Sequence, residues 1–287
     1  MIYLSKRKMG WSEKKIERYI SEGRGQGELK DYKPWLTTQS FSTKGNSPRL
    51  HGWKTDRMHE YFSDLEKFYF FILEWSEKVI DIREQYPILD RAMTADIAAE
   101  LGAKHPCDHS TDCFIPFTTD FMITVVSRGK KTFLARQVKP SSQLEDPRVI
   151  EKFEIEAEYW YQKGINWAIV TEKDISTPLA KNIMNVHKYF HLENQEHEED
   201  AQRLVKYLVE KKNTNGYWNL IDLADQFDEL NNSSMGTSLN YIRHLIATKK
   251  ISIDMYKNFV PRNVLLEEVE IPDQVLYKGE INNGFIS

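Results

Sequence analysis

The chain has 287 residues, of which 40% are hydrophobic and 12% aromatic, so it can form one large folded domain or two smaller ones and is not a disordered chain. Its longest uninterrupted apolar run, Phe68–Leu73, is too short to cross a bilayer, and its N-terminus lacks the apolar segment of a signal peptide. Two cysteines, Cys107 and Cys113, are too few for a disulfide framework. We therefore expect a cytoplasmic protein with no membrane partner.

The net charge of −4 hides an asymmetry along the chain. Residues 1–60 contain 13 Lys and Arg against 7 Asp and Glu, which leaves +6 there and −10 on the rest. A basic N-terminal arm on an acidic body favours contact with a polyanion, although an ordinary solvated surface explains it equally well. The candidate DNA-binding residues of this arm are Lys6, Arg7, Lys8, Arg24, Lys54 and Arg57.

The first elements follow from capping residues and apolar spacing. Residues 12–22 predict a short helix with Ser12 as its N-cap, ended by the glycines of 23–27. The polar, basic stretch 23–56 predicts a loop with little regular structure. Residues 57–76 predict the first long helix, because large apolar side chains recur there at helical spacing.

An α/β sheet is predicted for the middle of the chain. Alternating apolar residues indicate strands at 79–86, 119–126 and 132–139, then a long helix at 143–163 and another strand at 166–171. A strand, a helix and a further strand in succession favour an α/β fold. Residues 90–117 show no pattern that assigns them.

After Thr171 the sequence pattern changes from alternating strands and helices to mainly helices. A helix beginning near Ser176 is followed by helices near 200–212, 217–228 and 235–249, and then by a strand pair near 251–255 and 259–267. Three helices followed by a hairpin are typical of a winged-helix domain. We therefore divide the chain into domains 1–171 and 172–287. The balanced charge of the second domain favours protein docking at least as much as DNA reading.

The turn between the second and third strands decides which side chains meet. A two-residue loop within 127–131 places Asp120 directly across from Gln137, whereas a four-residue loop places it across from Lys139. In either register the three side chains share one face of the hairpin, because cross-strand partners point the same way. An ordinary solvated strand end is the plainer interpretation of each residue taken singly.

Glu66 is the fourth member of this constellation. It lies at the edge of the apolar stripe of the first long helix, beside Phe62, Tyr69 and Phe70. A carboxylate placed there must be paired, hydrogen-bonded or metal-bound, because an isolated buried charge is costly. If this helix packs on the sheet, Glu66 can reach the face that carries Asp120.

Two carboxylates, an amide oxygen and a lysine suit metal-assisted hydrolysis of a phosphodiester. Hard oxygen ligands hold Mg²⁺, and a neighbouring lysine can position or deprotonate the attacking water. Asp120, followed after sixteen residues by Gln137-Val138-Lys139, fits the restriction-endonuclease-like signature D…(D/E)-x-K, with glutamine in place of the second acid. We expect two Mg²⁺ ions held by Glu66, Asp120 and Gln137, for which Mn²⁺ can substitute.

Several short motifs resemble the TnsA family, the endonuclease subunits of heteromeric bacterial transposases. The matching words are "EGRGQG", "KDYKPWL", "SDLE" around Glu66, "DIREQYP", "STDC" and "TTDF" leading to Asp120, and "QVKP" at 137–140. The resemblance covers nearly the whole chain. Glutamine at position 137 is what TnsA proteins have, so this departure from the general nuclease signature supports an active site.

The resemblance implies a restriction-endonuclease-like catalytic domain followed by a winged-helix-like domain, in the bacterial cytoplasm. TnsA proteins cut the 5′ ends of the transposon in cut-and-paste transposition, with TnsB acting on the 3′ ends and the ATPase TnsC as regulator. Glu66, Asp120 and Gln137 match the metal-binding positions and Lys139 the catalytic lysine. Glu156 matches a further acidic position with an auxiliary role.

Two other functions stay open on the sequence. The chain could be a non-catalytic factor that bridges transposase and ATPase, or a free-standing restriction or repair nuclease of the same fold. The intact set of Glu66, Asp120, Gln137 and Lys139 argues against a non-catalytic factor. The modest charge of the C-terminal domain argues against a free-standing nuclease, which would need its own DNA-reading domain. A separate loop contains His105, Cys107, His109 and Cys113, whose spacing is not that of common zinc fingers.

Overall fold

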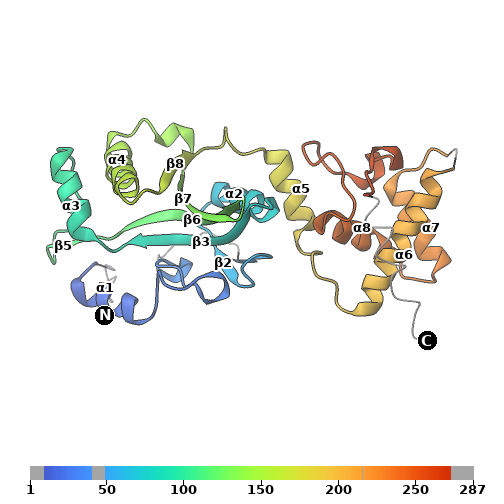
Figure 1. Cartoon of the computed structure of the whole chain (residues 1–287), viewed down its shortest axis with the longest axis horizontal. Coiled ribbons are helices and arrows are strands. Elements are labelled where there is room, and N and C mark those ends of the chain that lie inside the picture. The colour runs from blue at the N-terminus through green and yellow to red at the C-terminus, as the bar shows by residue number, and fades with distance from the viewer. Residues whose placement is uncertain (1–9, 41–48, 215, 273–287) are drawn as a thin grey trace, which may run out of the picture. The chain divides into compact units, whose positions relative to one another are not determined.

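The computed structural model describes residues 10–40, 49–214 and 216–272 of the chain (Figure 1). Three of the candidate DNA-binding residues, Lys6, Arg7 and Lys8, lie outside these ranges. The chain divides into two compact units, Met1–Ile175 and Ser176–Ser287, with the division four residues later than the sequence analysis placed it. No helix within the described ranges is long and apolar enough to cross a membrane.

A four-stranded sheet forms the centre of the N-terminal unit. The strands lie in the order β3-β6-β7-β8, with antiparallel pairs except for the parallel pair of β7 and β8. Helix α4 connects that parallel pair, as a crossover helix must. The predicted strands and the α/β class are confirmed. The bounds are β3 Val79–Ile88, β6 Phe117–Ser127, β7 Lys130–Val138, α4 Pro147–Gln162 and β8 Asn166–Val170.

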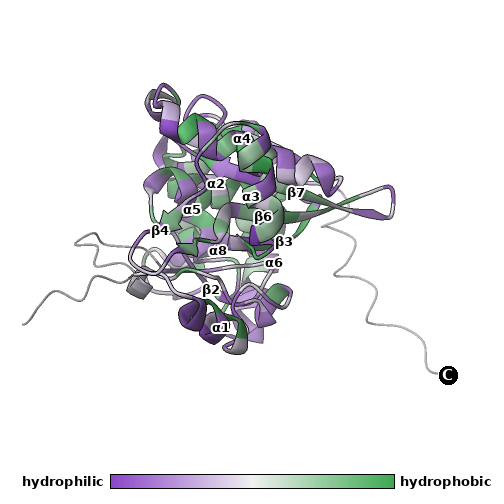
Figure 2. Cartoon of the chain, turned by 90° about the vertical axis from the view of Figure 1, so that its left-hand side faces the viewer, coloured by the Kyte–Doolittle hydropathy of each residue, from purple (hydrophilic) through white to green (hydrophobic). Residues whose placement is uncertain are grey.

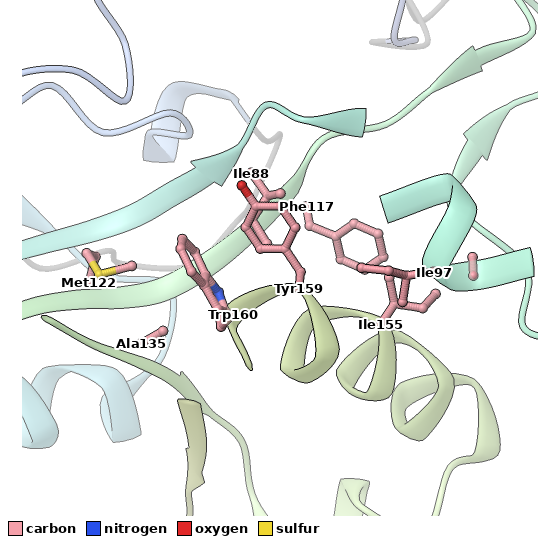
Figure 3. Packing of buried hydrophobic residues seen from close by; sticks show 9 residues of the cluster. Ile88, Ile97, Phe117, Met122, Ala135, Ile155, Tyr159 and Trp160 are labelled. Atoms are coloured by element: carbon pink, nitrogen blue, oxygen red, sulfur yellow. The ribbon is translucent and has the colours of Figure 1, made fainter. Parts of the chain in front are cut away.

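Helix α4 packs on one face of this sheet and encloses an apolar core (Figure 3). Ile155, Tyr159 and Trp160 of α4 pack against Met122 and Ala135 of the central strands. The region that the sequence left unassigned adds α3 (Arg91–Glu100), whose Ile97 joins this core, and a small hairpin of β4 (Cys107–Asp108) and β5 (Cys113–Phe114).

The first long helix begins later than predicted. Helix α2 runs over Asp64–Trp75, whereas Met58–Glu60 is strand β2, paired with β1 (Arg49–His51). The physical reason is local: the Ser63 hydroxyl accepts the Glu66 N–H and so caps the helix at that point. The stretch 23–56 also contains strand β1, which the sequence analysis missed. Helix α1 (Glu13–Ser21) begins after Ser12 as predicted.

The β6–β7 hairpin has the tighter of the two predicted turns. Its register runs from Ser127 opposite Lys130 to Phe121 opposite Arg136, which leaves a two-residue turn. In Figure 2 the hairpin extends away from the helices that cover the sheet, and its tip is hydrophilic. The next positions along this register are Asp120 and Gln137.

The C-terminal unit is helical. The helices α5 and α8 lie where they were predicted, whereas α6 begins five residues earlier and α7 three residues later than predicted. The strand pair expected near 251–267 is not formed within the described ranges. That stretch contains only isolated bridges and short 3₁₀ turns, so the winged-helix assignment is not confirmed. The bounds are α5 Thr177–His187, α6 Gln195–Lys212, α7 Leu220–Leu230 and α8 Thr237–Ala247.

A single buried amide explains why the expected hairpin gives way to a loop. The Asn182 side chain donates to the carbonyl oxygens of Met255 at 2.8 Å and Lys257 at 2.5 Å, and it accepts the Phe259 N–H at 3.0 Å. These bonds take three backbone groups that a strand ladder would otherwise use. The loop is therefore held by α5 in place of a partner strand.

Candidate active site

Asp120 lies at the point where the β6–β7 ladder ends. Its Oδ2 accepts the backbone N–H of Val138 at 2.9 Å, and its Oδ1 accepts the Gln85 Nε2–H at 3.1 Å. Val138 is the last residue of β7 and stands between Gln137 and Lys139, so this bond brings Asp120 to the end of β7 where both candidate residues lie. Each oxygen of Asp120 keeps a lone pair for a further partner.

Gln137 is buried, and its amide has one orientation that satisfies its neighbours. Its Nε2 donates to the Thr118 carbonyl oxygen at 2.8 Å and to Glu156 Oε2 at 2.6 Å. Both partners are acceptors, so the nitrogen must face them. The amide oxygen accepts no hydrogen bond from the described part of the chain, and it is the atom that a hard cation prefers.

Glu156 is a buried carboxylate that holds this amide in place. Besides Gln137, its Oε1 accepts the Thr119 hydroxyl at 2.6 Å and the Trp167 Nε1–H at 3.1 Å. Trp160 in turn donates to the Thr119 oxygen at 2.9 Å. Burial raises the pKa of Glu156 to about 7, although three donors favour its charged form. Glu156 therefore acts on the site through Gln137.

Glu66 is the third residue of helix α2 and is held by the N-terminal cap of that helix. Its Oε1 accepts the Ser63 hydroxyl at 2.8 Å and its Oε2 accepts the Phe62 N–H at 3.1 Å. The side chain is only 7% exposed. The sequence prediction that a carboxylate at this position must be hydrogen-bonded or metal-bound is met by the cap.

Glu66, Asp120 and Lys139 lie close enough to act on one another electrostatically. Burial and then the negative charge of Asp120 raise the pKa of Glu66 to about 7, while the ammonium of Lys139 acts in the opposite direction. Burial also raises the pKa of Asp120, against the Val138 N–H, Lys139 and Gln85. Two carboxylates in one field resist simultaneous ionisation, and a cation between them would remove that resistance.

The donor set fits a hard divalent cation. Among residues 10–40, 49–214 and 216–272, no group of three or more His, Cys, Asp and Glu side chains is arranged to hold a metal ion. A cation at this site would therefore take the two carboxylates of Glu66 and Asp120 and a neutral oxygen from Gln137. Oxygen-only ligands of this kind favour Mg²⁺ or Mn²⁺ over zinc.

Arg57 is not available to bind DNA, contrary to the sequence prediction. Its guanidinium is buried and pairs with both oxygens of Glu84, at 2.7 and 2.5 Å, and it also donates to the Ile82 carbonyl. Arg24 is partly exposed, donates to Glu22 at 2.7 Å and lies over the Tyr19 ring. The Lys54 N–H donates toward Glu74.

The loop with two histidines and two cysteines is structural in its described contacts. His105 is hydrogen-bonded to Thr94 and to the Pro106 carbonyl, and Cys113 is buried beside Glu13. Both cysteines are free thiols. Cys107 and Cys113 lie on the paired strands β4 and β5, in diagonal positions of the ladder.

Sequence reasoning missed two residues that position the site. Ser63 caps α2 and binds Glu66, and the Ser-x-x-Glu spacing of a capping box gives a signal that would have found it. Gln85 binds Asp120 from the neighbouring strand, where its backbone has a φ of 48°. A left-handed residue inside a strand leaves no signature in one sequence.

Comparison with known proteins gives the class of the protein and then its family. The family described as TnsA-like endonuclease N terminal matches residues 76–172, and the one described as TnsA endonuclease C terminal matches residues 174–255. The chain is thus an endonuclease by family. It is also 38% identical over 256 residues to the Transposon Tn7 transposition protein TnsA of Escherichia coli, covering 89% of this chain and 91% of that relative. The chain belongs to the TnsA family.

Proposed function

We propose that this protein is a metal-dependent DNA endonuclease of a transposase, with its active site at Glu66, Asp120, Gln137 and Lys139. The observation that carries the proposal is the buried pair of carboxylates whose pKa values are raised beside a lysine. Buried, uncompensated acids are costly, and they persist where a ligand or a reaction needs them.

Glu66, Asp120 and the Gln137 oxygen would hold one or two Mg²⁺ ions. When bound, such ions lower the pKa of an attacking water and offset the charge that develops on a phosphate. The remaining work falls to the chain. Ser63 and Gln85 fix the two carboxylates, and Glu156 holds the Gln137 nitrogen, which leaves the amide oxygen free for a cation. The Lys139 side chain can orient the water as an ammonium or accept its proton as a neutral amine.

The substrate of this site is proposed to be the phosphodiester at the 5′ ends of a transposon. The relative from the Tn7 transposon is a transposition protein, and it matches over 89% of this chain. We infer that a TnsB-like subunit processes the 3′ ends and that a TnsC-like ATPase licenses the reaction. This division assigns one strand to each subunit and gives a direct test.

The test substitutes Asp120, because this residue of β6 is hydrogen-bonded to Val138 on one neighbouring strand and to Gln85 on the other. In a reconstituted reaction on end-labelled transposon DNA, Asp120→Ala should reduce 5′ cleavage by about 10³-fold or more while 3′ joining continues. Asp120→Asn, which keeps the shape, serves as the control for folding. Normal 5′ cleavage by both variants would place the active site elsewhere.

The same assay separates the alternatives. A non-catalytic bridging factor would leave 5′ cleavage unchanged when the Asp120 carboxylate is removed. A free-standing nuclease would cut DNA without the transposase partner or the ATPase. Cleavage that depends on Asp120 and on both partners supports the proposed function.

A further inference from the structure

The turn of the β6–β7 hairpin carries a concentrated positive charge that the proposed mechanism does not use. Arg128, Lys130 and Lys131 are exposed, and within the described ranges none of them forms an ion pair. The stretch 127–133 contains no acidic residue. Three cations so close together repel one another unless an anion lies between them.

The backbone of this turn is left-handed at Arg128, where arginine is an unusual residue. Arg128 has a φ of 51° and Gly129 a φ of 75°, the left-handed pair of a type I′ turn. Asparagine or aspartate followed by glycine is the usual choice for such a turn, because their short polar side chains can hydrogen-bond locally and offset the Cβ strain of the left-handed region. Strain that persists at one residue points to a function for its side chain.

The charged turn and the candidate active site lie at opposite ends of the same two strands. Ser127 at the turn and Asp120 are seven positions apart on β6. At about 3.3 Å per residue the hairpin spans roughly 23 Å between them. In a DNA duplex, with about 3.4 Å along the axis per base pair, this length corresponds to roughly seven base pairs.

We propose that Arg128, Lys130 and Lys131 bind the phosphate backbone of the duplex about seven base pairs from the cut, so that the DNA lies along the hairpin. The inference rests on the proposed nuclease function and names the element that holds its substrate. Contacts of this kind are independent of sequence and position the duplex. Each phosphate neutralised releases counterions, so the contact must weaken with salt.

The first test measures DNA affinity of the full-length chain against salt concentration. The variant Arg128→Asn, Lys130→Thr, Lys131→Thr removes the three charges and places the preferred residue in the turn. Its thermal stability should therefore not fall. The slope of log affinity against log salt should decrease by about 1 for each charge that contacts a phosphate.

A matched control removes the same charge elsewhere. Lys152→Gln, Lys181→Gln, Lys206→Gln changes three exposed helical lysines and alters the net charge equally. This control should keep the slope of the unmodified protein. An equal slope for the hairpin variant and the control would overturn the inference.

The second test uses duplexes shortened from each side of the cut. The hairpin variant should differ from the unmodified protein on long duplexes, and the difference should vanish when one side ends closer than about seven base pairs from the cut. A difference that survives every truncation, or a loss of cleavage with unchanged DNA affinity, would assign the hairpin to a protein partner and overturn the inference. If the unmodified protein fails to cut transposon ends with its partners, the proposed function fails instead.

Discussion

Two buried glutamates in the N-terminal unit show opposite solutions to the same electrostatic problem. Glu84 lies between Arg57 and His59, at 2.5 and 2.8 Å, and its contacts with these two side chains outweigh its burial and lower its pKa to about 2. Glu66 is buried beside Asp120, and its pKa is raised to about 7. One carboxylate is compensated within the fold, whereas the other is not.

The difference distinguishes a structural cluster around Glu84, which anchors the N-terminal segment, from a candidate cation site at Glu66 and Asp120. The Glu84 cluster joins the N-terminal segment to β3, because Arg57 also donates to the Leu29 carbonyl and Tyr32 donates to the Glu84 carbonyl. Among the residues that the structure describes, Lys139 is the ammonium that offsets the charge at Glu66 and Asp120. The missing positive charge is what a divalent ion would supply.

The largest effect after Asp120 is expected at Lys139. Lys139→Ala should reduce cleavage by about 10² to 10⁴-fold, because it removes the group that we propose to orient the water. An ammonium cannot ligate a metal, so calorimetric titration with Mn²⁺ should show binding that is retained in Lys139→Ala and weakened in Asp120→Ala. Equal loss of Mn²⁺ binding in both variants would give Lys139 a structural role.

Breaking the ion pair of Arg57 and Glu84 should destabilise the protein while leaving the residues of the proposed metal site in place. Arg57→Met leaves Glu84 buried without its guanidinium and should lower the free energy of unfolding by about 3–5 kcal/mol. Adding Glu84→Gln removes the orphaned charge and should restore part of this loss. Denaturant unfolding of the single and double variants measures both effects, and an unchanged stability in Arg57→Met would show that the pair is not an anchor.

The amide–carboxylate pair of Gln137 and Glu156 offers a finer test. Gln137→Glu restores the general nuclease signature but sets a second carboxylate against Glu156, 2.6 Å away in the present structure. We expect cleavage to fall by about 10 to 100-fold. Combining it with Glu156→Gln reverses the pair and should recover activity. A double variant no better than the single one would exclude this positioning role.

The smallest effect concerns pH. A protonated Glu66 is a poor ligand, so Mn²⁺ affinity should rise by up to about tenfold per pH unit as the pH passes through about 7. Glu66→Gln, which keeps an acceptor for the cap, should show a flatter profile. Calorimetry between pH 6 and 8 measures the change, and identical pH profiles would remove Glu66 from the ligand set.

Glu66 and Glu84 change the free energy of unfolding with pH in opposite directions. Without metal, the folded chain holds the Glu66 proton more tightly than the unfolded chain does, so raising the pH from 4.5 toward 7 lowers the free energy of unfolding. Glu84 acts the other way: its contribution is present above 4.5 and is lost as the pH falls toward 2.

Much of the catalytic unit could be predicted because its signals are local. Alternation gave the central strands, and Ser12 gave the start of α1. The hairpin turn brought Asp120 to Gln137 because the register of two strands follows from a two-residue loop. The strands that failed to form near 251–267 had the same local signal, but Asn182, more than seventy residues away, takes their backbone bonds.

The burial of Arg57 could not be predicted for the same reason. A cation in a basic, polar stretch looks exposed, and only Glu84 on β3 makes its burial possible. Gln85 and Glu156 likewise bind their partners across the sheet or from a helix behind it. One sequence holds no record of such distant pairs.

The bond between Asp120 and the Val138 N–H makes one backbone atom a reporter of the site. The shift of an amide proton depends on the charge of the carboxylate that accepts it. The Val138 resonance should therefore move when Asp120 gains a proton or a cation. Isotope-labelled protein would then allow occupancy to be followed in a nuclear magnetic resonance titration of the unmodified chain, without substrate and without turnover.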